Sequence, residues 1–174
     1  MRVIAGEFRS RRLKTLPGQA LRPTPDRLRE ALFNILAPRI AGATFLDAYA
    51  GSGAVGIEAL SRGAAHATFI EKHPAAVELI RENLASLALE DRATIIRAAA
   101  TTALPGHRAD IYFLDPPYTS PAEYRSALTL LGDRSDALVL AQHDKRLALE
   151  DRYGALHRRR VLTQGDNSVS FYQA

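Results

Sequence analysis

The fold is decided by the stretch ATFLDAYAGSGAVG, residues 43–56, in which a short apolar run passes directly into a glycine-rich turn. The run at 43–49 has the length and composition of a buried strand, and a helical pattern follows at 54–62. Gly51, Gly53 and Gly56 have the spacing G-x-G-x-x-G, which lets the backbone turn tightly and approach a ligand closely. This unit predicts an α/β protein with a ligand at the carboxyl end of the strand.

The same alternation continues toward the C-terminus. Further apolar runs of strand length lie at 66–71, 93–97, 109–115 and 136–142, and further helical patterns at 74–88 and 121–131. Such alternation predicts a parallel sheet that is covered by helices on both faces. The last two predicted strands, 155–163 and 168–173, are joined by a short turn without a helix, so we expect an antiparallel hairpin to close the sheet.

The region before residue 43 has a different pattern. Short segments at 2–5 and 12–14 predict a β-hairpin. Thr24-Pro25-Asp26 predicts the start of a helix, with Thr24 as the N-cap, and Pro38 predicts its end. We therefore divide the chain into an N-terminal extension, residues 1–24, and an α/β domain, residues 25–174.

The basic character of the chain is concentrated at its N-terminus. The whole sequence of 174 residues has a net charge of +4. Residues 1–30 hold eight basic and three acidic residues, a net charge of +5, and the remainder sums to −1. Clustered Lys and Arg at one end are typical of an arm that binds a polyanion. A solvated surface segment would fit the same count.

The composition also excludes several classes of protein. The absence of cysteine excludes disulfides, Cys-ligated zinc and a thiolate nucleophile. The five histidines share no ligand spacing, so we expect no metal site. The sequence has no apolar run of about 18–20 residues and no signal peptide, and we expect a cytoplasmic protein without membrane contact.

Two carboxylates indicate which ligand the glycine turn would take. Asp47, just before the glycines, would repel a pyrophosphate but suits an ammonium group, which favours S-adenosylmethionine over a dinucleotide. Glu71 ends the run at 66–71 and could accept hydrogen bonds from both ribose hydroxyls. The alternative for Glu71 is an ordinary surface carboxylate.

The tetrad Asp115-Pro116-Pro117-Tyr118 ends the predicted strand at 109–115. The two prolines fix φ and remove two backbone donors, which leaves rigid carbonyls. Accepting both N–H groups of an exocyclic base amine, at the Asp115 carboxylate and the Pro116 carbonyl, would favour the pyramidal amine whose lone pair can attack a methyl sulfonium. Tyr118 could stack on the base. The alternative is a proline-rich turn without chemistry.

These residues together resemble the amino-directed, S-adenosylmethionine-dependent nucleic acid methyltransferases, and most closely the bacterial 16S rRNA guanine-N2 methyltransferases. The resemblance runs from residue 2 to Ser170-Phe171-Tyr172. The segments that carry it are Arg2-Val3-Ile4-Ala5-Gly6, Leu21-Arg22-Pro23-Thr24, Asp26-Arg27-Leu28-Arg29-Glu30-Ala31-Leu32-Phe33-Asn34-Ile35-Leu36, Tyr49-Ala50-Gly51-Ser52-Gly53, Gly56-Ile57-Glu58-Ala59-Leu60-Ser61-Arg62-Gly63 and Asp115-Pro116-Pro117-Tyr118.

The resemblance implies a Rossmann-like class I methyltransferase fold, with a seven-stranded, mostly parallel sheet whose last strand is antiparallel. It also implies an N-terminal hairpin and helix extension that contacts RNA. The reaction would methylate the N2 amine of a guanine in 16S rRNA, in an assembled or assembling small subunit, and we expect a monomer.

Site residues follow from the same resemblance. The expected catalytic residues are Asp115, Pro116, Pro117 and Tyr118. Those expected to bind the cofactor are Asp47, Ala50, Gly51, Ser52, Gly53, Glu71, Lys72, Ala99 and Asp115. Those expected to contact RNA are Arg9, Arg11, Arg12, Lys14, Arg22, Thr24 and Arg27. Ala99 stands where the family usually has Asp or Asn for the adenine amine, so adenine recognition would use backbone groups or a neighbour such as Thr101, or would be weaker.

Two other functions stay open at this point. The tetrad recognises an amine rather than a particular base, so an adenine-N6 or other base-amine methyltransferase on DNA or RNA fits as well. The departure at Ala99 would also fit a non-catalytic RNA-binding protein of the same fold.

Overall fold

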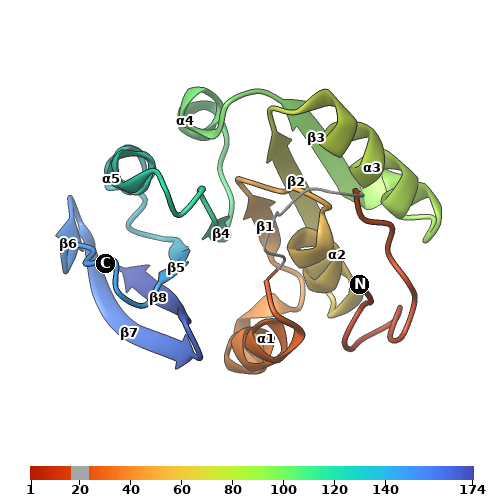
Figure 1. Cartoon of the computed structure of the whole chain (residues 1–174), viewed down its shortest axis with the longest axis horizontal. Helices are drawn as coiled ribbons and strands as arrows, with labels where there is room; N and C mark the ends of the chain where they lie inside the picture. The colour runs from red at the N-terminus through yellow and green to blue at the C-terminus, as the bar shows by residue number, and fades with distance from the viewer. Residues whose placement is uncertain (17–23) are drawn as a thin grey trace.

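The computed structural model describes residues 1–16 and 24–174. Within this part the chain forms one eight-stranded sheet, in the order β3-β2-β1-β4-β5-β8-β7-β6 (Figure 1). The strands are β1 (Thr44–Asp47), β2 (His66–Glu71), β3 (Ala93–Arg97), β4 (Ile111–Leu114), β5 (Leu138–Asp144), β6 (Arg152–Tyr153), β7 (Leu156–Gln164) and β8 (Asn167–Gln173). The first five strands are parallel, and β8, β7 and β6 are each antiparallel to the preceding strand in the sheet.

Helices cover both faces of this sheet (Figure 1). They are α1 (Asp26–Ile40), α2 (Ala54–Ser61), α3 (Pro74–Ala85), α4 (Ala100–Ala103) and α5 (Pro121–Leu130), with short 3₁₀ turns η1 (Glu90–Arg92) and η2 (Leu104–Gly106). Phe45 packs in one hydrophobic cluster with α1, α2 and α3, whereas its neighbour Leu46 packs in a second cluster with α4 and α5. Successive strand residues point to opposite faces. Both faces are therefore core, as the continuous apolar runs predict.

The order of the strands determines where a ligand can bind. The chain proceeds outward from β1 through β2 to β3, and then continues at β4 on the other side of β1. The carboxyl ends of β1 and β4 therefore meet at the point where the strand order reverses, which is the usual ligand site of doubly wound sheets. Asp47 ends β1, and Asp115 directly follows β4.

The predicted strands and long helices are confirmed, including the antiparallel end of the sheet. The sheet has eight strands instead of the expected seven, because the two residues of β6 also pair with the edge of β7. Two residues are too short to produce an apolar run in the sequence.

The start of α1 differs from the prediction. Pro25, not Thr24, occupies the N-cap position, and the side-chain hydroxyl of Thr24 is used instead in a buried hydrogen bond to Gln142. Pro38 lies inside the helix, which continues to Ile40. A proline in the last turn removes only one helical hydrogen bond, so the helix tolerates it.

The N-terminal extension is packed against the α/β domain. The expected hairpin is reduced to one antiparallel bridge between Arg2 and Arg12, supported by a hydrogen bond from the Val3 amide to the Arg11 carbonyl (3.0 Å). Val3 and Leu13 are buried in the same cluster as α1 and α2. The extension thus contributes to the hydrophobic core.

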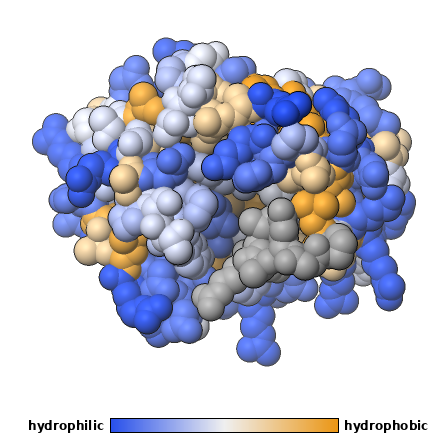
Figure 2. Space-filling view, turned by 45° about the horizontal axis from the view of Figure 1, so that its top comes forward, coloured by the Kyte–Doolittle hydropathy of each residue, from blue (hydrophilic) through white to orange (hydrophobic). Residues whose placement is uncertain are grey.

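The surface is mainly hydrophilic on the face that Figure 2 shows, where apolar residues form small separate patches. In the described ranges, Leu130 and Val161 are the exposed large hydrophobic residues. No helix in these ranges is long and apolar enough to cross a bilayer.

Candidate active site

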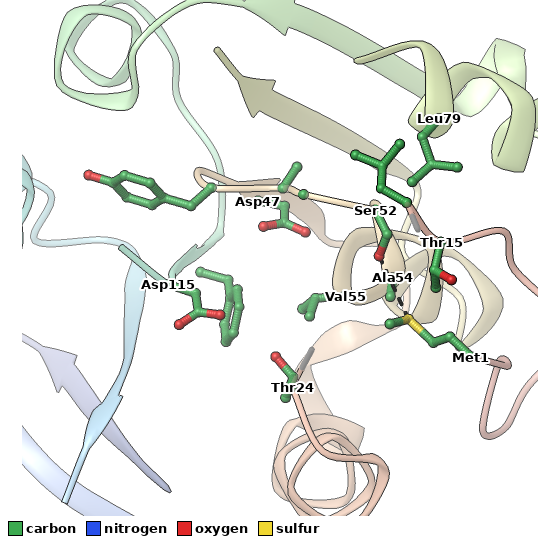
Figure 3. A pocket seen from close by; sticks show the side chains of 14 residues that line it. Met1, Thr15, Thr24, Asp47, Ser52, Ala54, Val55, Leu79 and Asp115 are labelled. Carbon is green, nitrogen blue, oxygen red and sulfur yellow. Dashed lines mark hydrogen bonds between the residues drawn. The ribbon is translucent and has the colours of Figure 1, made fainter. Parts of the chain in front are cut away.

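A cavity of about 290 Å³ lies at the carboxyl ends of β1 and β4 (Figure 3). Four parts of the chain line it: the N-terminal extension, the end of β1 with the glycine turn and the start of α2, one residue of α3, and the end of β4 with the residue that follows it. The lining residues are Met1, Thr15, Leu16, Thr24, Asp47, Tyr49, Ala50, Gly51, Ser52, Ala54, Val55, Leu79, Phe113 and Asp115. Residues far apart in sequence thus converge on the predicted ligand site.

The glycine turn has the backbone that its spacing predicts. Gly53 is the N-cap of α2 at φ +80°, in the left-handed region that favours glycine. A Cβ on Gly56 would lie 2.3 Å from a ring carbon of Phe69, so only glycine lets α2 approach β2 this closely. The Gly56 amide donates to the Asp47 carboxylate (3.1 Å), which fixes that side chain beneath the turn.

Glu71 supports the turn from the adjacent strand. Its carboxylate accepts hydrogen bonds from the backbone amides of Gly51 and His73, both at 2.9 Å. Glu71 is buried and does not line the cavity, although a carboxylate has lone pairs for further donors. The alternative of an ordinary surface carboxylate is wrong, because the side chain is 9% exposed.

Two carboxylates face the cavity from neighbouring strands, as Figure 3 shows for Asp47 and Asp115. Burial raises the pKa of Asp47 to about 7, with a smaller contribution from the negative charge of Glu71. Burial, together with the charge of Asp47, raises the pKa of Asp115 well above its usual value. The cavity therefore favours a cationic ligand, whose charge would offset the repulsion between the two carboxylates.

The rest of the tetrad lies outside this cavity. Pro116 is buried, and its carbonyl accepts a hydrogen bond from the Tyr124 hydroxyl (3.1 Å). The Tyr118 hydroxyl donates to the side-chain carbonyl of Asn167 (2.8 Å), which fixes the ring by its polar end. The tetrad is therefore held in place by α5 and β8.

Gln142 on β5 connects these groups, although it is not among the site residues predicted from the sequence. Its amide nitrogen donates to Asp115 (3.2 Å) and lies 3.4 Å from the Tyr118 hydroxyl, and its side-chain oxygen accepts from Thr24 (3.0 Å). The side chain is 1% exposed. The signal in the sequence is a polar pair, Gln142-His143, at the end of the otherwise apolar strand beside Asp115.

The other predicted cofactor residues are placed differently. Ala50, Gly51 and Ser52 line the cavity, whereas Gly53, Lys72 and Ala99 do not. Lys72 and Ala99 are exposed, and Ala99 is the residue just before α4.

The predicted RNA-contacting residues are also dispersed. Thr24 is buried and lines the cavity, and Arg22 lies outside the described residues. The other five are exposed: Arg9, Arg11, Arg12, Lys14 and Arg27. Arg11 donates to the Ser86 carbonyl (2.8 Å), and Lys14 forms an ion pair with Glu82 (2.9 Å). Among residues 1–16 and 24–174 there is no group of three or more His, Asp or Glu that could hold a metal ion.

Comparison with known protein sequences gives matches along the whole chain. The sequence model of the family described as "Conserved hypothetical protein 95" matches residues 1–173. "Putative rRNA methyltransferase YlbH" of Bacillus subtilis is 36% identical over 184 residues, which covers 99% of this chain and 98% of that protein. "Ribosomal RNA small subunit methyltransferase D" of Escherichia coli strain K12 is 47% identical over 119 residues, which covers 68% of this chain and 60% of that protein.

A solved structure agrees with these matches. The protein described as "Putative methyltransferase yhhF from Escherichia coli" superposes with a TM-score of 0.87 at 36% identity, covering 99% of this chain and 97% of that chain. The agreement includes the N-terminal extension as well as the sheet.

Proposed function

The chain belongs to the conserved hypothetical protein 95 family, and from this membership and the carboxylate-lined cavity we propose that it is an S-adenosylmethionine-dependent rRNA methyltransferase. We further propose that it methylates the N2 amine of a guanine in 16S rRNA of the small subunit. The observation that carries the proposal is the convergence of Asp47, the glycine turn and Asp115 on one cavity.

The charge of the cavity and the open backbone at Gly51 support this choice of cofactor. S-adenosylmethionine carries an ammonium and a sulfonium group, and two carboxylates with raised pKa values face the cavity. A pyrophosphate would add negative charge to the same place. A Cβ on Gly51 would meet no atom within 4 Å, so the backbone there is open to a ligand. When bound, the cofactor supplies an activated methyl group.

Asp115 and Pro116 would position the target amine. The Asp115 carboxylate accepts one N–H, and the Pro116 carbonyl, which has a second lone pair beside its bond to Tyr124, accepts the other. The bound cofactor would supply its sulfonium methyl as the electrophile for the amine nitrogen and keep the electron pair of the S–C bond on sulfur, and the Asp115 carboxylate would accept the proton that the methylated amine loses. The chemistry needs alignment and no covalent enzyme intermediate.

The N-terminal extension would supply phosphate contacts. Arg9 and Arg12 on the extension and Arg27 on the neighbouring α1 are exposed, and the charged group of none of them forms a hydrogen bond or ion pair with another described residue. Several exposed cations without an intramolecular partner suit a polyanionic substrate.

The test is Asp115→Asn with 16S rRNA, free and in isolated small subunits, as substrate. We expect turnover to fall about a hundredfold or more, because one preorganised charged acceptor at the reacting amine is lost. Binding of S-adenosylhomocysteine, measured by calorimetry, should persist. Mass spectrometry of digested product identifies the methylated nucleoside. Undiminished turnover would contradict the role of Asp115, and methylation at another amine would contradict the guanine assignment.

A further inference from the structure

Asn83 on α3 connects the N-terminal extension to the glycine turn. Its side-chain oxygen accepts from the Lys14 amide (2.8 Å), and its side-chain nitrogen donates to the Lys14 carbonyl (3.1 Å). The same nitrogen donates to the carbonyl of Ser52 in the glycine turn (3.0 Å). The residue is 1% exposed. One buried side chain thus satisfies both backbone groups of Lys14 and one backbone group of the turn.

The extension also takes part in the cavity itself. Met1 and Thr15 line it beside Ser52 (Figure 3), and Leu16 lines it as well. The Ser52 hydroxyl lies 3.7 Å from the Met1 sulfur, and the Leu13 amide donates to the Met1 carbonyl (3.0 Å). The two segments of the extension that reach the cavity, Met1 and residues 13–16, are therefore hydrogen-bonded to each other. Asn83 fixes the segment 13–16 to α3.

An amide side chain is required for this arrangement. Pairing with both the N–H and the C=O of Lys14 needs an acceptor and a donor at one position, and Asn supplies one acceptor and two N–H groups. The neighbouring Glu82 also holds Lys14, but through an ion pair in which both side chains are more than half exposed. Exposed pairs contribute little to stability, whereas unpaired buried polar groups are costly.

We propose that Asn83 is a positioning residue that holds the N-terminal extension against the glycine turn, so that Met1, Thr15 and Leu16 complete the cofactor pocket. This inference rests on the proposed function in so far as the ligand of the pocket is S-adenosylmethionine. The extension is then part of the cofactor site as well as a candidate RNA contact, and its docking determines cofactor affinity in the absence of RNA.

The test compares Asn83→Ala with wild type and with Glu82→Gln as a matched control on the same helix. Calorimetry with S-adenosylmethionine and S-adenosylhomocysteine, without RNA, should give a Kd about tenfold higher for Asn83→Ala, in the range of typical coupling between sites. Glu82→Gln should bind within about twofold of wild type, since an exposed ion pair has little effect. At saturating cofactor, kcat should stay near the wild-type value while the KM for the cofactor rises, because the hydrogen bonds of Asn83 go to Lys14 and Ser52 and not to Asp115.

Amide hydrogen exchange provides a readout that general destabilisation would not reproduce. In wild type and Glu82→Gln, cofactor should slow exchange across residues 13–16, and in Asn83→Ala this protection should be lost while β4 and β5 stay protected. If Asn83→Ala does not fold, Asn83→Asp serves instead, because it keeps the acceptor for the Lys14 amide and loses both donated bonds.

The outcomes separate the two proposals. If the wild type and a folded Asn83 variant bind the cofactor equally well, and the cofactor slows amide exchange in residues 13–16 equally in both, the proposed role of Asn83 is overturned. The proposed function is not affected by that outcome. A wild type that binds neither S-adenosylmethionine nor S-adenosylhomocysteine overturns the proposed function and this inference with it.

Discussion

Asp115 depends on one neighbour for its orientation. Gln142 donates to its carboxylate and is itself held by Thr24, so the proposed acceptor for the target amine is positioned from β5 and from the segment just before α1. Gln142→Met keeps the volume of the side chain but removes these bonds. We expect kcat to fall about tenfold, as for the loss of a hydrogen bond to a charged group. Cofactor Kd should stay within about twofold, because Gln142 does not line the cavity. Steady-state kinetics and calorimetry on one preparation check both, and an unchanged kcat would contradict the positioning role.

Asp47 predicts a pH dependence of stability. Burial raises its pKa to about 7, so between about pH 4 and pH 7 the folded state binds a proton that the unfolded state has released. Stability contributed at this site therefore falls as the pH rises through that window, by at most about 1.4 kcal/mol per pH unit. Asp47→Asn lacks this titration. Urea unfolding should show a difference in unfolding free energy, variant minus wild type, that increases from pH 4 to 7 and levels off above it. A difference that decreases from pH 4 to 7 would contradict the raised pKa of Asp47.

At the scale of elements, hydrogen bonds from its backbone attach the N-terminal extension to α2. Glu58 on α2 is fully buried, and its carboxylate accepts from the amides of Ile4 (2.8 Å) and Ala5 (3.0 Å). Arg62 donates to the same carboxylate at 2.8 Å. Farther along, the Glu7 amide donates to the Ser61 carbonyl (2.8 Å). The extension is thus attached to the C-terminal half of α2 through its backbone.

Gly6 makes this attachment possible and gives a sharp test. Its φ is +85°, and a Cβ there would lie 1.9 Å from the Ser61 carbonyl oxygen. Gly42 is the matched control, since its φ is +76° but a Cβ would meet no atom within 4 Å. Both Gly→Ala changes carry the left-handed penalty of about 1–2 kcal/mol, and only Gly6→Ala adds the clash. We expect Gly6→Ala to lower the unfolding free energy further and to speed amide exchange in residues 2–8. Equal effects of the two variants would show that the close contact with Ser61 does not matter.

The elements that could be predicted from sequence are those with a long regular pattern. The apolar runs of β1 to β5 and the face of α3 made by Val77, Ile80 and Leu84 depend only on local spacing. What the sequence could not supply are bonds between distant residues. Thr24 has the ordinary character of an N-cap, but its hydroxyl bonds to Gln142, 118 residues away. Asn83 is recognisable as a polar residue on an apolar face, and only the folded chain brings it to Lys14 and Ser52.

The same limit applies to the candidate site. Asp47, Gly51 and Asp115 could be identified because they lie at or close to the carboxyl ends of two predicted strands, and the carboxyl ends of parallel strands lie at one edge of the sheet. Met1, Thr15 and Leu16 have no motif of their own. They reach the cavity because the extension is folded back along α2 and α3, which is a property of the whole molecule (Figure 1).

At the scale of the whole molecule, the two proposals together predict that the extension links two ligands, the cofactor and RNA. Its ends line the cofactor cavity, and Arg9 and Arg12 between them are exposed candidates for phosphate contact. When one ligand holds the extension in its docked position, the other ligand loses less free energy in ordering the extension. The two ligands should therefore bind with positive cooperativity. By linkage, RNA must raise cofactor affinity by the same factor by which cofactor raises RNA affinity, and we expect about fivefold or more.

A double variant, Arg9→Ser with Arg12→Ser, tests the predicted cooperativity between RNA and cofactor by removing two positive charges from the extension. Each lost phosphate contact should reduce the slope of log K for a single-stranded rRNA fragment against log salt by about 0.7, so the pair should reduce it by about 1.4. Cofactor affinity measured without RNA should be unchanged in this double variant, because neither side chain lines the cavity. At subsaturating RNA, the increase in cofactor affinity that RNA causes in the wild type should disappear. The control removes two exposed cations from the face covered by α4 and α5, Arg108→Ser with Arg125→Ser, and should leave both slope and cooperativity intact. Equal losses in the two double variants would mean that net charge, rather than the extension, attracts the RNA.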